Sequence, residues 1–342
     1  MQLAENLTEQ ELNDLAKTLL GPFPNTYIYT KCMAEQLVRR YGTELPIGVF
    51  RPAIVISTYK EPISGWVDNV YGPTGALAGA GIGLLRTMNM DTGRTAELIP
   101  ADYTVNALIV TAWAVATKRF RNETTDPPIY NYQSSWGSGS GISWGRYMDL
   151  AVKHGRQAPC VHSVWCYTFT AAKNPHVYLL LMTLLHLLPA ALVDAALILA
   201  GSKPRILRIY KRLHKFSAVT SYFCTRDWNF SHDNTQRLWD TLCPTDQALF
   251  AFSMRTFDWD DFMYVCVRGL RLHILKDDPS TIPRAKLRMA RFAVLHDLIK
   301  VTGLLLILWL SYTIACVFLR VFTGLSEILT DATSSFLRSF PA

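Results

Sequence analysis

The sequence predicts an α/β unit followed by a mostly helical part that associates with a membrane. In residues 25–42, side chains recur at three- and four-residue steps, which is the period of a helix. The apolar run at 45–56 has the composition of a buried strand in a parallel sheet. A charge-free run at 301–319 is long enough to cross a bilayer. These three stretches together indicate the fold class.

The composition favours contact with a membrane and with anionic partners. Half of the 342 residues are hydrophobic and the mean hydropathy is +0.13, which is high for a wholly soluble protein. The formal net charge of +7 favours lipid headgroups, a phosphorylated cofactor or nucleic acid. The basic residues flank apolar runs and are not interleaved with exposed aromatic residues, so we expect no nucleic-acid binding.

The cysteines indicate a reducing compartment. The chain has seven, an odd number with no Cys-x-x-Cys pair, so they do not form a disulfide framework. Residues 1–20 lack the basic start and apolar core of a signal peptide. We therefore expect reduced thiols and a catalytic part that faces the cytosol.

Two helices are predicted at the start of the chain. Leucines set among acids and amides predict an amphipathic surface helix over Gln2–Leu20, and the sequence Gly-Pro-Phe-Pro at 21–24 breaks it. Asn25 is a good N-cap for the next helix, which we expect to run to Tyr41 and stop at Gly42.

Tyr27 and Lys31 are candidate catalytic residues on the second helix. They are four residues apart, so the phenol and the ammonium group can project side by side. A cation beside a phenol favours the phenolate, which makes the hydroxyl a usable proton donor near neutral pH. A carbonyl reductase needs such a donor, because a proton must reach the oxygen when hydride reaches the carbon. On spacing alone, a solvent-facing Tyr–Lys pair on an amphipathic helix is the simpler interpretation.

The segment after this helix gives the pair its context. Residues 45–56 form an apolar run with a proline inside, and we expect a buried parallel strand that leaves through a proline-broken turn. A Tyr-x-x-x-Lys helix followed by a strand ending in Arg-Pro-x-Ile-Val (51–55) resembles the extended short-chain dehydrogenase/reductases. With Gly-Trp-Val-Asp-Asn at 65–69, the chain resembles the alcohol-forming fatty acyl-CoA reductases of animals, especially those of insects.

The resemblance implies a Rossmann-type extended short-chain reductase domain that uses NADPH. Tyr27 would be the proton donor, and Lys31 would hold the nicotinamide ribose and keep Tyr27 acidic. Backbone around Pro52, Ile54 and Val55 would line the nicotinamide edge. The implied reaction reduces a long-chain fatty acyl-CoA to a fatty alcohol: a first hydride gives a hemithioacetal, which loses CoA, and a second hydride reduces the aldehyde.

The family carries a strand and a glycine-rich turn for the cofactor phosphates well before its Tyr–Lys helix, and an upstream Ser or Thr that bonds the carbonyl oxygen. No such segment precedes Tyr27 in this sequence. We therefore expect residues 1–125 to be the C-terminal part of the reductase domain, in a chain that is N-terminally incomplete through a partial gene model or a truncated isoform. On that expectation, the affinity of the chain alone for NADPH is negligible.

Three further expectations concern the rest of the reductase part. The glycines at 72–83 match neither Gly-x-Gly-x-x-Gly nor the Walker pattern, so we reject a phosphate loop. By resemblance they form a flexible stretch between nicotinamide and acyl chain, and a plain structural loop fits equally well. Asp102 precedes an apolar helix at 105–116, and we expect it to cap that helix rather than act as a catalytic acid. Residues 129–132 are the expected last strand.

A junction segment is expected at 126–175. Glycines and serines at 137–141 predict a flexible connector. Two histidines and two cysteines follow, but their spacing matches no common zinc finger, and the neighbouring proline and tryptophan fit a packed loop. We therefore expect no metal site at His154, Cys160, His162 and Cys166.

Two apolar runs come after the junction. The run at 178–200 contains His186, Pro189 and Asp194, which are costly in a bilayer, whereas 301–319 carries no charge. Basic clusters follow the first run and precede the second, and both favour the cytosolic side. We therefore expect a helical domain at 176–300 with an interfacial or re-entrant hairpin bent near Pro189. One transmembrane helix at 301–319 and a tail at 320–342 would complete the chain.

The helical domain carries further motifs of the family. Arg-Asp-Trp-Asn-Phe at 226–230 and Phe-Asp-Trp at 257–259 are similar to the C-terminal domain that accompanies the reductase domain in this family. We expect their aromatic residues to serve core packing and interfacial anchoring.

Two other functions stay open on the sequence. One is a related membrane-anchored hydroxysteroid dehydrogenase, against which the Trp-rich C-terminal motifs argue. The other is a non-catalytic membrane fragment that binds lipid or a partner enzyme. For the reductase we expect fatty acyl-CoA and membrane lipid as partners. We expect a membrane location facing the cytosol, at the endoplasmic reticulum rather than the peroxisome.

Overall fold

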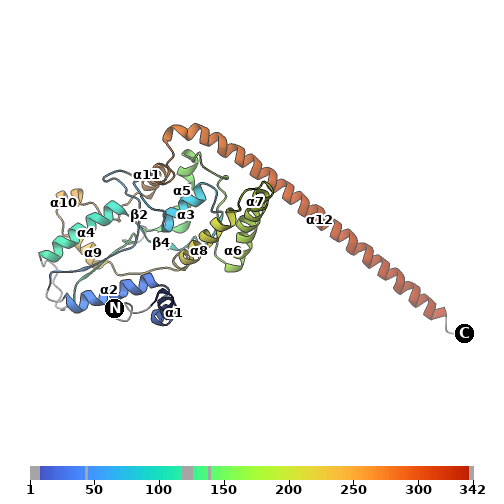
Figure 1. Ribbon diagram of the computed structural model, residues 1–342, viewed down its shortest axis with the longest axis horizontal. Coiled ribbons are helices and arrows are strands. Elements are labelled where there is room, and N and C mark those ends of the chain that lie inside the picture. Colours follow the sequence, from blue (N-terminus) through green and yellow to red (C-terminus); the bar gives the residue numbers. More distant parts are fainter. Residues whose placement is uncertain (1–7, 43–44, 118–125, 138–139, 339–342) are drawn as a thin grey trace.

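The computed structural model describes residues 8–42, 45–117, 126–137 and 140–338, whose arrangement is shown in Figure 1. An α/β part with short strands packs against helices from the C-terminal half, and the last helix, α12, projects away from both (Figure 1). The predicted fold class, an α/β unit followed by a mostly helical part, is confirmed. Expectations for the ends of the chain, for 118–125 and for the middle of the 137–141 connector lie outside the described residues.

Two capped helices open the described chain. α1 (Glu9–Leu20) follows Thr8, whose hydroxyl accepts the N–H of Glu11 while the Glu11 carboxylate accepts the N–H of Thr8. α2 (Thr26–Tyr41) starts after Asn25 and ends at Gly42. The predicted bounds of the second helix are confirmed. They were predictable because both caps are local sequence signals.

In the described parts of the chain, eight short strands form four pairs, three of them parallel. The parallel pairs are β1 (Val49–Pro52) with β6 (Ile129–Tyr132), β2 (Ile54–Ile56) with β5 (Leu98–Pro100), and β3 (Thr87–Asn89) with β8 (Thr170–Ala172). The antiparallel pair is β4 (Thr95–Ala96) with β7 (Ile142–Ser143). The strand expected at 129–132 is found as β6, but it is not the last strand, because β7 and β8 follow it.

The strand expected at 45–56 is found as β1 and β2, which are separated at Ala53. Both pair in parallel as expected, but the expectation of a buried strand is wrong, because Ile56 is the one buried residue of β1 and β2. The N–H of Ala53 donates to the carbonyl of Tyr132, whereas the N–H of Ile54 donates to the carbonyl of Glu97. The strand therefore changes partner within two residues. Pro52, which has no N–H to donate, directly precedes this change.

Three further helices of the described residues belong to the α/β part: α3 (Gly72–Gly81), α4 (Ala101–Ala116) and α5 (Trp144–Gln157). The first corrects the expectation of a flexible stretch or loop, because 72–81 is helical. Pro73 sits in the first turn, where a missing N–H costs nothing. The small residues that follow allow close packing: a Cβ on Gly79 would meet the Cβ of Leu85 at 3.2 Å. The small residues therefore serve packing in the core.

The C-terminal half is built from helices. They are α6 (Pro175–Met182), a π-helical turn (Thr183–Leu187), α7 (Leu188–Leu199), α8 (Ile206–Cys224), α9 (Asp233–Asp240), α10 (Pro244–Leu249), α11 (Trp259–Gly269), a second π-helical turn (Leu270–Ile274), a 3-10 turn (Pro279–Thr281) and α12 (Ile282–Arg338).

The run at 178–200 does not form the expected hairpin, because the chain does not reverse near Pro189. α6, the π-helical turn and α7 form one continuous helix, Pro175–Leu199. The π turn, closed by the N–H of Leu188 to the carbonyl of Thr183, leads into the first turn of α7, where Pro189 is tolerated. The chain instead reverses at Gly201 (φ 73°), where the N–H of Ser202 donates to the carbonyl of Leu197.

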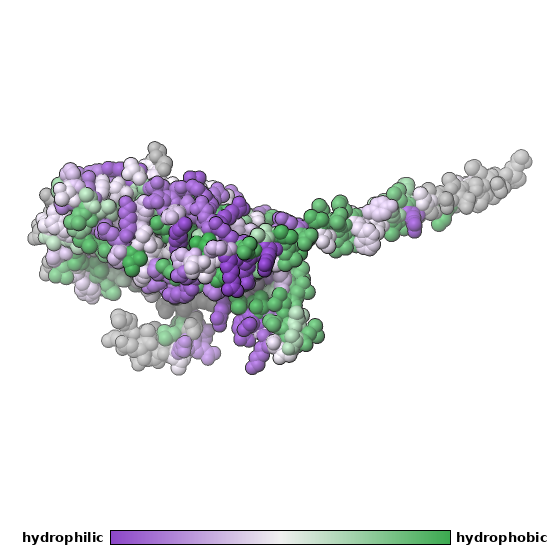
Figure 2. All heavy atoms as spheres, turned by 90° about the horizontal axis from the view of Figure 1, so that it is seen from above, coloured by the Kyte–Doolittle hydropathy of each residue, from purple (hydrophilic) through white to green (hydrophobic). Residues whose placement is uncertain are grey.

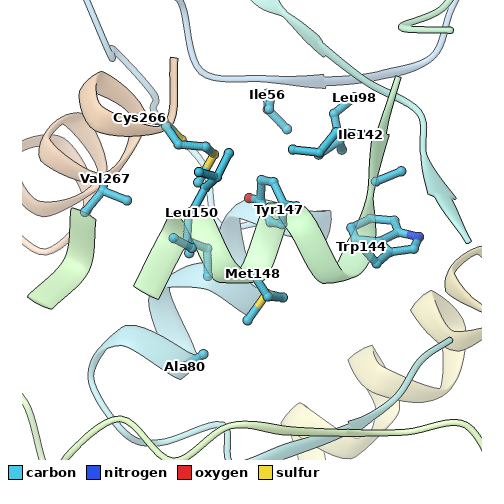
Figure 3. Close-up of a cluster of buried hydrophobic side chains, with 14 of the residues drawn as sticks. Ile56, Ala80, Leu98, Ile142, Trp144, Tyr147, Met148, Leu150, Cys266 and Val267 are labelled. Carbon is cyan, nitrogen blue, oxygen red and sulfur yellow. The ribbon is translucent and has the colours of Figure 1, made fainter. Parts of the chain in front are cut away.

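Two buried clusters join the halves of the chain. In the first, Ile56 of β2 and Tyr147 of α5 lie with Cys266 and Val267 of α11 (Figure 3). The second combines Val110 of α4 and Tyr132 of β6 with Leu238 of α9 and with Phe252, among others. Because each cluster draws on both halves, the α/β part and the helical part share their cores.

Two helices of the described chain are long and apolar enough to cross a membrane, Pro175–Leu199 and Pro279–Thr323. In the most apolar window of the second helix, no residue is buried inside the structure. In the corresponding window of the first helix, 17% of the residues are buried. Figure 2 shows hydrophobic side chains along the projecting part of α12 and on the segment beside its base.

Candidate active site

α2 presents Tyr27 and Lys31 to solvent on consecutive turns. Asn25 fixes the start of the helix, because its Oδ1 accepts the N–H of Ile28 at 3.0 Å. The Lys31 Nζ lies 5.7 Å from the centre of the Tyr27 ring, and Tyr27 is 67% exposed. The structure therefore brings the two predicted catalytic residues together, with the ammonium group against the ring and the tyrosine open to a ligand.

An ion pair ties α2 to strand β1. The Arg51 Nε donates to the Glu35 Oε1 at 2.8 Å, and the Arg51 Nη2 donates to the other carboxylate oxygen. This hydrogen bonding lowers the pKa of Glu35. Both side chains are partly exposed, so the pair contributes about 1 kcal/mol or less to stability. Its main effect is geometric: Glu35 lies one turn after Lys31, and Arg51 directly precedes Pro52.

Sequence reasoning missed Glu35 and Arg51 as positioning residues. A signal was present, because Glu35 follows Lys31 by four residues and Arg51 is the one charged residue between 45 and 56. A charge inside an apolar strand usually has a partner on the element that covers it. The structure supplies that partner from α2.

Pro52, Ile54 and Val55 lie where the strand changes partner. Pro52 and Val55 are exposed, and Ile54 is half-buried. Pro52 is the last residue of β1, and Ile54 and Val55 are the first two residues of β2. Ligands bind in open α/β sheets at the carboxyl ends of the strands, which is where Pro52 stands in β1. Within the described chain, no hydrogen bond or ion pair joins Tyr27 or Lys31 to these three residues. The connection between the helix and this strand end is made through Glu35 and Arg51.

Asp102 holds the loop that follows β2. Its carboxylate accepts the N–H groups of Tyr59 and Lys60, both at 2.8 Å, and of Glu61 at 3.1 Å. The expectation that Asp102 caps its own helix is wrong: the N-cap residue of α4 is Pro100, and no side chain caps that helix end. The carboxylate is buried and occupied by backbone, so its role is structural.

Exposure distinguishes Tyr27 from three tyrosines that lie inside the fold. Tyr59 donates its hydroxyl to the Asp261 Oδ2 at 2.6 Å, and burial together with that carboxylate raises the pKa of Tyr59. Burial likewise raises the pKa of Tyr103 and of Tyr147. These hydroxyls stay protonated inside the fold and are poor proton donors. Tyr27, by contrast, lies at the surface.

The two histidines and two cysteines of the junction do not converge. The His154 Nε2 lies 3.1 Å from an oxygen of Asp260, and His162 is exposed. Cys160 and Cys166 are buried, and burial raises the pKa of the Cys160 thiol to about 11. Among the residues that the structure describes, no three His, Cys, Asp or Glu side chains gather as metal ligands would.

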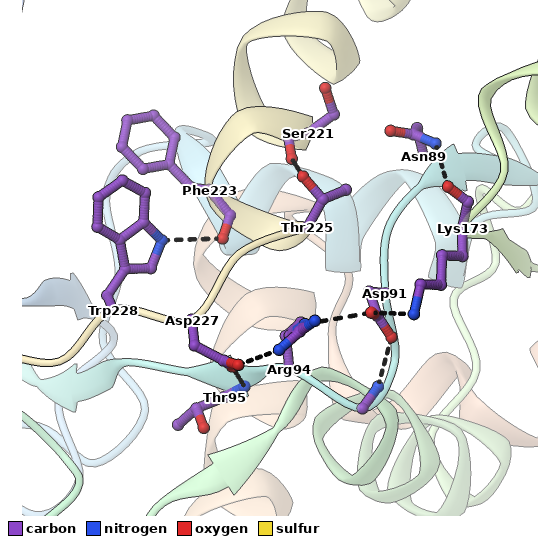
Figure 4. A network of polar contacts seen from close by, with 11 residues as sticks. Asn89, Asp91, Arg94, Thr95, Lys173, Ser221, Phe223, Thr225, Asp227 and Trp228 are labelled. Carbon is purple, nitrogen blue, oxygen red and sulfur yellow. Dashed lines mark hydrogen bonds and ion pairs between the residues drawn. The ribbon is translucent and has the colours of Figure 1, made fainter.

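The motif at 226–230 holds the two halves together. Asp227 forms an ion pair with Arg94, which also pairs with Asp91, and Asp91 pairs with Lys173 (Figure 4). The Trp228 Nε1 donates to the carbonyl of Phe223 at 3.2 Å. The motif thus ties the linker after α8 to the turn between β3 and β4.

Two family models match the chain, and both carry the description Male sterility protein. An NAD-binding model covers residues 2–108, and the second covers residues 185–277. The first includes α2 and the strand end described above. The second includes α7 through α11.

Similar proteins are named fatty acyl-CoA reductases. The chain is 40% identical to fatty acyl-CoA reductase wat of Drosophila melanogaster, over 93% of this chain and 60% of that protein. It is 33% identical to fatty acyl-CoA reductase 1 of Rattus norvegicus, over 80% of this chain and 52% of that protein. It is 31% identical to fatty acyl-CoA reductase 1 of Xenopus laevis, over 82% of this chain and 54% of that protein. The chain thus spans a little over half the length of these relatives. Their names favour neither of the two other functions that the sequence left open.

Proposed function

The chain belongs to the fatty acyl-CoA reductase family, and from this we propose that it takes part in the NADPH-dependent reduction of long-chain fatty acyl-CoA to fatty alcohol. The observation that carries the proposal is the exposed Tyr27–Lys31 pair on α2, linked through Glu35 and Arg51 to a parallel strand end. This is an arrangement in which a proton donor and a cation face the same ligand.

The residues around α2 fit the nicotinamide end of the cofactor. No carboxylate pairs with Lys31 in the described part of the chain, so its N–H donors are available to ribose hydroxyls. Pro52 and Val55 offer exposed apolar surface to a flat ring. The net charge of +7 favours the additional phosphate of NADPH over NADH. When bound, the cofactor supplies hydride to the acyl carbon.

Tyr27 supplies the protons of the reaction. In the first reduction it protonates the thioester oxygen, which gives a hemithioacetal, and this collapses to an aldehyde as the C–S bond breaks and CoA leaves as the thiol. In the second reduction it protonates the aldehyde oxygen, which gives the alcohol. Lys31 stabilises the phenolate that each transfer leaves behind, and it orients the ribose.

The test introduces Tyr27→Phe into the gene at its natural chromosomal position. The cell then produces the variant in the same form as the wild-type protein. Membranes are supplied with palmitoyl-CoA and NADPH, and hexadecanol is quantified. We expect Tyr27→Phe to lower the rate by about 10²–10⁴-fold, the range for a positioned acid. Tyr41→Phe is the matched control, because Tyr41 lies on the same helix, beside Arg40, and is 68% exposed.

Two results would count against the proposal. A wild-type rate in Tyr27→Phe would remove Tyr27 from the proton-transfer role. If membranes that contain the wild-type protein form no more alcohol than membranes that lack it, the proposed activity is contradicted.

We also propose that 301–319 crosses the endoplasmic reticulum membrane and that the catalytic part faces the cytosol. The support is a charge-free run with exposed side chains, preceded by a basic cluster at 284–300. Co-fractionation of the tagged protein with endoplasmic reticulum markers rather than peroxisomal ones is the expected result.

A further inference from the structure

A groove of about 850 Å³ lies where α12 leaves the folded part. One wall is apolar and comes from Leu181 and Leu185, at the end of α6 and in the π-helical turn. The facing wall is the first part of α12, including Ala290 and Ala293. Phe169, in the segment before β8, contributes a further apolar surface.

The groove carries more positive than negative charge. Arg86, Arg156 and Lys300 line it, against one carboxylate, Asp297. None of the three cations forms an ion pair among the residues that the structure describes. Arg86 lies over the ring of Trp165, at 5.2 Å from its centre. The groove therefore offers three cations that are not held in ion pairs, next to its apolar wall. This combination suits an anionic amphiphile.

The wall formed by α12 is fixed to the folded part. The Trp165 Nε1 donates to the His296 Nδ1 at 3.4 Å, and the Trp165 and Phe292 rings lie 5.6 Å apart. The Arg288 Nε donates to the carbonyl of Ser163 at 2.9 Å. These contacts hold the helix beside the groove up to the last turn before the apolar run.

The groove lies at the level where headgroups are expected. Lys300 directly precedes 301–319, so if that run spans the hydrocarbon core, Lys300 is at the cytosolic interface. The helix that supplies Leu181 and Leu185 also exposes Leu180, Leu184 and Leu188. Figure 2 shows hydrophobic side chains gathered on a segment below the base of α12. In Figure 1, α2 lies at the opposite side of the folded part, so the groove is separate from the Tyr27 site.

We propose that this groove binds one anionic phospholipid from the cytosolic leaflet. Its phosphate lies against Arg86, Arg156 and Lys300, and one acyl chain follows Leu181 and Leu185. The inference rests on the membrane anchoring in the proposed function. A lipid is favoured over acyl-CoA because the groove borders apolar surfaces that face the same leaflet, and because it is remote from α2.

The experiment reconstitutes the full chain in nanodiscs of phosphatidylcholine with a minority of phosphatidylserine, and counts retained lipids by native mass spectrometry. We expect one retained phosphatidylserine. Arg156→Gln combined with Lys300→Gln should lower its retention at least tenfold. Arg146→Gln combined with Lys276→Gln, which removes the same charge outside the groove, should leave retention unchanged. Ala293→Trp fills the groove without altering charge and should also exclude the lipid.

Several outcomes would overturn the inference. These are equal retention in the Arg156/Lys300 variant, no loss in Ala293→Trp, retention of phosphatidylcholine to the same extent, or replacement of the lipid by added palmitoyl-CoA. A protein that co-elutes with nanodiscs but retains no lipid contradicts this inference alone. A protein that does not enter nanodiscs contradicts the membrane anchoring as well. Neither result bears on alcohol formation, which is measured separately.

Discussion

At the scale of single residues, the candidate site consists of exposed reactive groups positioned by polar side chains. Tyr27 and Lys31 face solvent, whereas Glu35 reaches across to Arg51 and orients the helix that carries them. Asp102 is buried and holds the backbone of the loop after β2. Reactive groups can be exposed because the rigidity is supplied by these neighbours.

Asp102 gives the first prediction. Asp102→Ala leaves three backbone N–H groups of the loop 59–61 without their acceptor, and unsatisfied buried donors cost about 1–3 kcal/mol. We expect a lower midpoint of thermal unfolding in detergent, and a partial recovery in Asp102→Asn, which keeps one acceptor oxygen. Asp149→Ala, at an exposed position on α5, is the control. An unchanged midpoint in Asp102→Ala would show that water replaces the carboxylate at no cost.

At the scale of elements, local signals were readable in the sequence and distant ones were not. Asn25 and Gly42 gave the ends of α2 because caps act within a few residues. The helix α3 was missed because its glycines indicate flexibility until close packing is known. Asp102 was misassigned because its partners lie about 40 residues earlier in the chain. The continuous helix at 175–199 was missed because Pro189 indicates a break, whereas the contact that anchors the helix is made only in the fold.

That contact is made by His186, which is completely buried. Its Nε2 accepts the N–H of Arg86 at 2.9 Å, and its ring stacks on Tyr210 with the ring centres 4.8 Å apart. His186→Leu would leave the N–H of Arg86 unpaired, at a cost of about 2 kcal/mol. We expect faster hydrogen exchange at residues 84–88 and a lower unfolding midpoint. His176→Leu, exposed near the start of the same helix, should change neither. Unaltered exchange at 84–88 in His186→Leu would argue that the helix is held by other contacts.

At the scale of the whole molecule, a buried ion pair links the junction loop to the start of α12. Asp277 and Arg271 are both almost fully buried, and the Arg271 Nε donates to the Asp277 Oδ2 at 3.1 Å. The same carboxylate oxygen accepts the N–H of Val161 at 2.8 Å. The junction loop at Val161 and the segment 271–277, which are distant in sequence, therefore meet at one carboxylate.

The pair makes stability depend on pH. Burial alone would raise the pKa of Asp277, but hydrogen bonds from Thr281 and from the Val161 N–H lower it to about 2. A lowered folded-state pKa gives stability that is complete above the unfolded value near 4 and is lost as the pH falls toward 2. We expect a loss of about 2 kcal/mol over that range, measured as unfolding free energy in detergent. Asp277→Asn should be less stable at pH 5 and should lack this part of the pH dependence. An equal slope in both proteins would assign the acid sensitivity to other groups.

The topology of the chain follows from what the apolar helix 175–199 binds. Asp194 would be costly in a bilayer, but its carboxylate accepts the N–H groups of Arg205, Ile206 and Leu207, each at 2.9 Å, at the start of α8. Because His186 also accepts the backbone N–H of Arg86, one face of the helix packs against the folded part. We therefore propose that the helix lies at the membrane surface with both of its ends on the cytosolic side.

This gives a prediction for sealed microsomes. Protease tags inserted after Tyr41 and after Ser202, in the turn between α7 and α8, should both be cleaved. A tag after Ala342 should be shielded until detergent is added, because 301–319 carries the chain across. Cleavage of all three tags in detergent is the control. If the tag at 202 were shielded while the tag at 41 was cleaved, the helix 175–199 would cross the membrane, and the contacts of His186 and Asp194 could not form as the fold has them.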